Sequence, residues 1–91
     1  MNCFEMFVNM VEEATEKESR IYVLNEGKNT TSVFTFVPYE YNLENKIYIE
    51  GESCKFEIED IENIEMSYDE IEGEFVINVK GDIINIGCIT N

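Results

Sequence analysis

The sequence predicts an α+β domain in which an N-terminal amphipathic helix packs on a curved antiparallel sheet, or on an open small barrel, of five to six strands. Apolar residues recur with a helical period over residues 2–17, and from residue 20 onward they recur with a period of two between turn residues. A chain of 91 residues has room for one modest core. We therefore expect a single domain over residues 1–91, with the helix at 2–17 and antiparallel strands over 20–90.

The helix is expected because its apolar and acidic residues fall on different sides at helical spacing. Asn2 is a suitable N-cap, and Glu5 stands three residues later, where the second partner of a capping box belongs. Packing of the apolar side onto the sheet is the simplest interpretation, and a partner-binding stripe of Met and Phe is the alternative. The residues of the apolar side are Phe4, Phe7, Val8, Val11 and Ala14.

Residues 21–24 indicate a strand that is apolar on both faces, and residues 32–37 indicate a second strand. Together they predict the first hairpin, with its turn at 26–29. Phe34 and Phe36 lie on one side of the second strand. Pro38 has no N–H to donate to a ladder, so it either ends this strand or lies on an edge. The residues that follow, Tyr39 to Asn42, are expected to form a loop.

The next two strands are predicted at residues 46–50 and 54–58, on either side of a turn at 51–53. Ile47 and Ile49 should point inward from the first of them, as should Phe56 and Ile58 from the second. Residues 74–80 and 83–90 alternate in the same way around a turn at 81–82, and they predict the last hairpin.

The segment between these hairpins, residues 59–72, fits two structures. Ile61, Ile64, Tyr68 and Ile71 have helical spacing, whereas Ile64, Met66 and Tyr68 alternate as they would in a strand. We favour the strand, preceded by a short turn at residues 60–63.

The chain is strongly acidic, with 20 Asp and Glu against six Lys and Arg and a net charge of −14. The acidic segment, residues 50–74, contains eleven of these carboxylates and a single base, Lys55. Because a high net charge opposes the compact state, such crowding favours a role in binding a basic partner. It also predicts carboxyl pKa values raised by like-charge repulsion, that of Glu57 among them. The candidate partner-binding residues are Glu50, Glu52, Glu57, Glu59, Asp60, Glu62, Glu65, Asp69, Glu70, Glu72 and Glu74.

Catalysis has few candidate residues, and we expect no enzyme. The chain has no histidine, its serines lie in no nucleophile motif, and its glycines form no phosphate-binding loop. A pair of catalytic carboxylates usually needs a larger cleft than this chain can enclose. We also expect no cofactor and no specific metal: aligning Gly73 with the glycine of a calcium loop puts Tyr68 at the first ligand position.

The remaining composition suggests where the protein acts. The three cysteines form no C-x-x-C pair, which favours small buried side chains in a reducing cytoplasm. No apolar run is long enough to span a bilayer, and no basic region precedes the first apolar stretch, so we expect a cytoplasmic protein. Twelve Ile and ten Asn, with five Lys and one Arg, indicate an AT-rich genome such as that of a low-GC bacterium or its phage.

Direct binding to nucleic acid is disfavoured, because affinity for a duplex comes largely from cations that neutralise phosphates. Mimicry of nucleic acid is the more natural use of these acids. Outward side chains two residues apart on a strand are separated by about 6.6 to 6.8 Å, close to two base steps of one DNA strand. The pairs with this separation in sequence are Glu50/Glu52, Glu57/Glu59 and Glu72/Glu74.

In size, charge, AT-biased composition and acidic segment, the chain resembles the small phage and mobile-element inhibitors that mimic nucleic acid, especially the anti-CRISPR proteins. It resembles the uracil-DNA glycosylase inhibitors more remotely, through Glu52-Ser53 in a turn. The resemblance implies a stoichiometric inhibitor that occupies the basic nucleic-acid channel of a CRISPR effector nuclease from a low-GC bacterium. The alternatives are a small phage structural or accessory domain with a solvated acidic face, and an acidic antitoxin or immunity-type partner of a basic protein.

Overall fold

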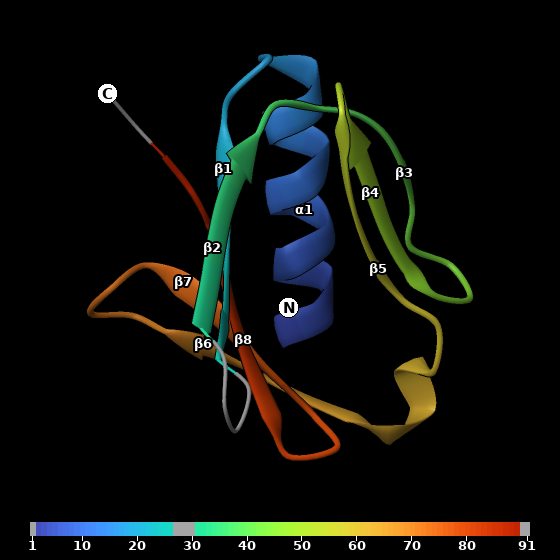
Figure 1. The fold of residues 1–91 in the computed structure, drawn as a ribbon, viewed down its shortest axis with the longest axis vertical. Helices are drawn as coiled ribbons and strands as arrows, with labels where there is room; N and C mark the ends of the chain where they lie inside the picture. The colour runs from blue at the N-terminus through green and yellow to red at the C-terminus, as the bar shows by residue number, and fades with distance from the viewer. Residues whose placement is uncertain (1, 27–30, 90–91) are drawn as a thin grey trace.

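The computed structural model describes residues 2–26 and 31–89 and places one helix, α1 (Cys3–Glu16), between two antiparallel sheets (Figure 1). The five-stranded sheet has the order β2-β1-β8-β7-β6. Its strands are β1 (Ile21–Glu26), β2 (Thr31–Phe36), β6 (Ile64–Asp69), β7 (Glu74–Val79) and β8 (Asp82–Cys88). The three-stranded sheet has the order β3-β4-β5, with β3 (Pro38–Asn42), β4 (Ile47–Gly51) and β5 (Cys54–Ile58). A short 3-10 helix, η1 (Ile61–Asn63), connects the two sheets.

The predicted helix is confirmed, and so is its cap. The backbone N–H of Glu5 donates to Asn2 Oδ1 at 2.8 Å, and Asn2 Nδ2 donates back to Glu5 Oε1 at 3.0 Å. The reciprocal bond thus uses the amide side chain of the cap instead of its backbone N–H. At the other end, the N–H of Lys17 bonds to the carbonyl of Glu13, and Glu18 turns the chain with a φ of 54°.

One hydrophobic core holds the helix and both sheets together. Phe7, Val11 and Ala14 are the buried residues of α1, and the Phe7 ring meets Phe75 of β7 edge-on, with the ring centroids 5.4 Å apart. The isoleucines of both sheets complete the core, including Ile21, Ile47, Ile49, Ile77 and Ile86. The α+β class and the inward directions of Ile47, Ile49, Phe56 and Ile58 are therefore confirmed.

The described residues form eight strands rather than five to six, and they divide into two sheets. The division occurs at Val37, the one residue between β2 and β3. Pro38 begins β3 on the edge of the smaller sheet, so the loop expected from Tyr39 to Asn42 was wrong: residues 40–42 pair with β4, and Tyr39 lies at a shift in the register. An edge strand needs partners on one side only, and it can therefore begin with a residue that has no N–H.

The two sheets approach closely where Gly51, the last residue of β4, packs against Phe36. A Cβ at Gly51 would lie 2.6 Å from Phe36 Cδ2 and 2.6 Å from the carbonyl oxygen of Val37. Glycine is therefore required here by space and not by an unusual φ.

The ambiguous segment is resolved as η1 followed by β6, which confirms the strand preceded by a short turn. The hairpins β1–β2, β4–β5 and β7–β8 are confirmed as antiparallel pairs. Most of the first predicted turn, and the last predicted strand residue, Thr90, fall outside the described residues.

Candidate acidic interaction surface

The eleven predicted acids lie on both sheets and on the connection between them, not on a single sheet face. Glu50 belongs to β4 and Glu57 to β5, whereas Glu65, Asp69 and Glu74 belong to β6 and β7. The remaining six lie in turns, in η1 or just after a strand: Glu52, Glu59, Asp60, Glu62, Glu70 and Glu72.

The three i, i+2 pairs do not run along strands as expected. Glu52 follows the end of β4, Glu59 follows the end of β5, and Glu72 precedes the start of β7. One member of each pair therefore lies outside the strand, so a regular spacing of about 6.6 to 6.8 Å does not apply to it. If the carboxylates resemble a series of phosphates, the acids in the turns must therefore contribute to that arrangement.

The Glu74 carboxylate forms hydrogen bonds within the five-stranded sheet. It accepts hydrogen bonds from Tyr22 Oη at 2.5 Å and from Asn85 Nδ2 at 2.7 Å. Burial and the bond to Glu74 raise the pKa of Tyr22 far above its usual value. The Tyr22 ring reaches Glu74 by crossing Gly87, where a Cβ would lie 2.7 Å from the phenol oxygen. Such a ring over a strand glycine replaces the missing side-chain packing.

Acidic side chains on the outward face of the three-stranded sheet also interact with neighbouring side chains of that sheet. Glu50 accepts from Tyr48 Oη at 2.5 Å and from Tyr39 Oη at 3.3 Å. The hydrogen bond to Glu50 and burial raise the pKa of Tyr48 to about 12. Lys46 Nζ lies 2.9 Å from Glu57 Oε2. This hydrogen bond, more than the two nearby lysine charges, lowers the pKa of Glu57, so the pKa increase expected from crowding was wrong for this residue.

Asp60 and Asp69 have local roles. Asp60 Oδ2 accepts from Asn63 Nδ2 at 2.7 Å across η1. Asp69 Oδ1 accepts from the backbone N–H groups of Ile71 and Glu72, at 3.0 and 3.2 Å, and so fixes the β6–β7 turn. This turn holds Ile71 at its tip with 93% of the residue exposed.

The other six acids of the segment are exposed, and their carboxylates form no hydrogen bond or ion pair with another described residue: Glu52, Glu59, Glu62, Glu65, Glu70 and Glu72. Three of them lie around η1 and the start of β6, and two lie in the turn at its end. The six residues of β6 separate these two groups by about 17 Å, at roughly 3.3 Å per residue. We call the six residues the free acidic set.

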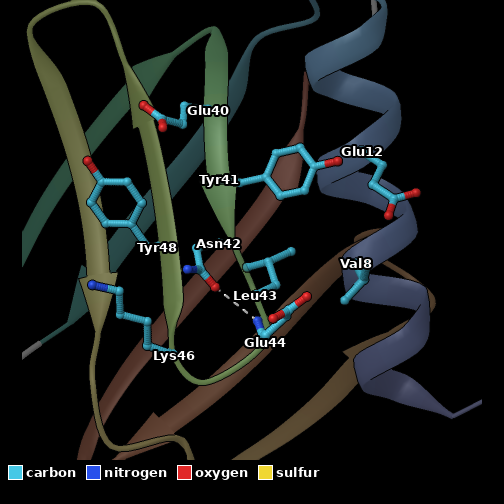
Figure 2. A pocket seen from close by; sticks show the side chains of 9 residues that line it. All are labelled: Val8, Glu12, Glu40, Tyr41, Asn42, Leu43, Glu44, Lys46 and Tyr48. Atoms are coloured by element: carbon cyan, nitrogen blue, oxygen red, sulfur yellow. Dashed lines mark hydrogen bonds between the residues drawn. The ribbon is translucent and has the colours of Figure 1, made fainter.

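A groove of about 580 Å³ between α1 and β3–β4 adds carboxylates that lie outside the acidic segment. Figure 2 shows Tyr41 of β3 reaching towards Glu12 of α1 across this groove. Glu40 and Glu44 line its other side with one cation, Lys46. Sequence reasoning did not group these acids because Glu12 belongs to α1, whereas Glu40 and Glu44 lie far from it in the sequence, on β3 and just after it.

Other kinds of site have little support in the described residues. No group of three or more Cys, Asp or Glu side chains within residues 2–26 and 31–89 is arranged to hold a metal ion. Burial raises the pKa of the thiols of Cys3 and Cys88, which makes them poorer nucleophiles. In the same part of the chain, α1 is too short and too polar to cross a bilayer.

Comparison with protein families, with curated proteins and with solved structures finds no significant match to this chain. Its function must therefore be inferred from the residues and their geometry.

Proposed function

We propose that this protein is a stoichiometric inhibitor that presents its free acidic set to the basic nucleic-acid-binding cleft of another protein. The target class to test first is a CRISPR effector nuclease of a low-GC bacterium, which the compositional resemblance suggests. The inhibitor competes with nucleic acid because its carboxylates occupy cationic positions that otherwise bind phosphates.

The observation that carries the proposal is the lack of charge compensation. The 20 acids form only two ion pairs between described residues, Lys17–Glu13 and Lys46–Glu57. A carboxylate that already has a cation must exchange it on binding, whereas an exposed, unpaired carboxylate loses only water and counterions. The free acidic set is therefore the part of the acidic segment best suited to a basic partner.

The position of the set also supports the proposal. Its two main groups lie at the two ends of β6, about 17 Å apart, which is close to five base steps of one DNA strand at roughly 3.4 Å each. The hydrogen-bonded strand β6 and the turn fixed by Asp69 hold the groups at a defined separation. Such preorganisation lowers the entropy cost of binding.

The proposal can be tested by adding the protein to purified, guide-loaded CRISPR effector nucleases from low-GC bacteria and measuring cleavage of target DNA. We expect cleavage by at least one effector to stop near equimolar inhibitor. The double variants Glu62→Lys/Glu65→Lys and Glu70→Lys/Glu72→Lys, one at each end of β6, should each weaken inhibition about tenfold or more, since rim charges govern steering and register.

The matched control for the Glu62→Lys/Glu65→Lys variant is Glu16→Lys/Glu18→Lys, at the end of α1 far from η1 in Figure 1. It does not serve for the Glu70→Lys/Glu72→Lys variant, because Lys17 and Ser19 line the same groove as Glu72. Each double variant adds four charges and changes the net charge from −14 to −10. If the control weakens inhibition as much as the Glu62→Lys/Glu65→Lys variant does, the position of the charges around η1 does not matter. If no effector is inhibited, or if the Glu62 and Glu70 variants inhibit as well as the parent, the acidic segment is a solvated face and the structural-domain interpretation replaces the proposal.

A further inference from the structure

The chain has four edge strands among its described residues, and one of them lacks the usual protection against pairing. The edges are β2 and β6 in the larger sheet and β3 and β5 in the smaller one. An edge strand exposes unpaired N–H and C=O groups, and proteins protect such edges with charges, prolines, bulges or a covering element.

Three of the four edges have such protection. β3 begins with Pro38, and its register shifts between Pro38 and Glu40. β5 carries Lys55 and Glu57 on its outward face, and β6 carries Glu65 and Asp69. In contrast, β2 has the sequence TSVFTF, with no charge and no proline, and it pairs with β1 without a bulge over its six residues.

We propose that β2 is a self-association edge: the β2 strands of two copies of this chain pair antiparallel and join the two five-stranded sheets into one ten-stranded sheet. This inference does not depend on the proposed function. A two-fold axis at Val33 is the register that the structure favours. Opposite residues of an antiparallel pair share a face, so Val33 would meet its own copy, and Ser32 would lie opposite Phe34 of the second copy.

The exposure of Val33 supports this register. It is 65% exposed on the outward face of the sheet, where an antiparallel sheet usually has polar residues. The two-fold axis covers each Val33 with the other, and contact between β-branched side chains directly across two strands is favourable.

The charges beside β2 fit the same arrangement. Arg20 Nη1 hydrogen-bonds to Thr35 near one end of β2, and Glu26 of β1 pairs in register with the other end. Antiparallel pairing of two copies brings the Arg20 end of one copy beside the Glu26 end of the other. The two charges would be about two strand spacings apart, roughly 10 Å, which is comparable to the Debye length at 0.1 M salt.

The expected dimer is weak and strengthens with salt. Pairing of two edge strands buries a small interface, typical of transient complexes. Each copy has a net charge of −14, so repulsion between copies opposes association at low ionic strength. The acid-rich strand β6 lies at the opposite edge of the same sheet, which makes β2 the edge where this repulsion is least.

Sedimentation velocity of the purified full chain tests the proposal, at protein concentrations from about 0.01 to 1 mM and at low and high salt. We expect a monomer–dimer equilibrium that shifts towards dimer as salt is added. Val33→Lys should lower the association constant by about tenfold or more, because two lysines would then lie directly opposite each other. The matched control Ile71→Lys adds the same charge at the exposed turn between β6 and β7. It should leave the association constant no lower than that of the parent.

Oxidative crosslinking tests the register and does not depend on how Val33→Lys folds. Val33→Cys should form a disulfide-linked dimer, whereas Thr35→Cys should not, because a residue two positions from the axis lies about 13 Å from its copy. The proposal is overturned if the wild-type chain stays monomeric at all concentrations and salts, or if it forms larger aggregates in place of a dimer. It is also overturned if the Val33→Lys variant dimerises like the parent, or if both cysteine variants crosslink equally.

Discussion

Replacement of Glu74 by alanine should destabilise the fold, although the sequence places this residue among the partner-binding acids. The change removes the acceptor of two hydrogen bonds, from Tyr22 Oη and from Asn85 Nδ2. A hydrogen bond to a charged group contributes roughly 1.5 to 3 kcal/mol. Because Glu74 is half-buried, solvent screens part of this contribution, and we expect a total loss of about 2 kcal/mol.

The environment of Asn85 supports a cost of this size. Its Oδ1 is already buried without a donor among the described residues, so loss of Glu74 would leave both polar atoms of this amide without a protein partner. A buried polar group left unsatisfied costs about 1 to 3 kcal/mol. The matched control is Glu72→Ala, two residues from Glu74 in the sequence. This change removes an exposed carboxylate that has no described partner.

Urea unfolding of both variants measures the difference. Glu74→Ala should lower the free energy of unfolding by about 2 kcal/mol, which is on the order of 10 °C in Tm for a domain of this size, while Glu72→Ala should stay within about 0.5 kcal/mol of the parent. In a double-mutant cycle, Tyr22→Phe and Glu74→Ala should be less than additive. If the two alanine variants have equal stability, Glu74 is not a structural residue and belongs with the free acidic set.

Three further changes test other parts of the structure. Lys46→Met should destabilise the protein at pH 7, because the bond from Lys46 lowers the pKa of Glu57 below its unfolded value and so stabilises the fold above that range. This difference should be lost as pH falls through the lowered pKa of Glu57, and thermal unfolding across pH would contradict the prediction if the difference persisted in acid. Phe7→Ala should cost about 3 to 5 kcal/mol in urea unfolding, since the ring is fully buried between α1 and β7. Gly51→Ala should cost more than about 1 kcal/mol, because the new Cβ would meet Phe36 and a backbone oxygen, and an unchanged urea midpoint would show that the sheets can separate there.

The elements of this fold were predictable where one face is buried and the period is regular. The helix and the β7–β8 hairpin have apolar residues at strict spacing, and both were confirmed. The strand Pro38–Asn42 was missed because four of its five residues are exposed, which leaves no apolar alternation to recognise. The division into two sheets was missed for a related reason: the chain first passes from the larger sheet to the smaller one through a single residue, Val37.

The candidate site was predictable in composition but not in the roles of its acids. A local run of charge identified the acidic segment, but it could not separate structural carboxylates from free ones. The partner of Glu74 is Tyr22, 52 residues away in sequence, and the partner of Glu57 is Lys46, eleven residues away. Only the strand order and register bring these pairs together, so charge reversal at Glu57 or Glu74 would disturb the fold as well as any binding.

The rate of association with an inhibited nuclease, measured against ionic strength, tests the proposed charge mimicry most directly. The Debye length falls from about 10 Å at 0.1 M salt to about 3 Å at 1 M, so electrostatic steering by the free acidic set weakens as salt is added. Stopped-flow mixing should show an association rate constant that falls by at least about tenfold from low to high salt, and the Glu62→Lys/Glu65→Lys variant should have a shallower dependence. An association rate constant that does not change with salt would contradict mimicry of nucleic acid by these carboxylates.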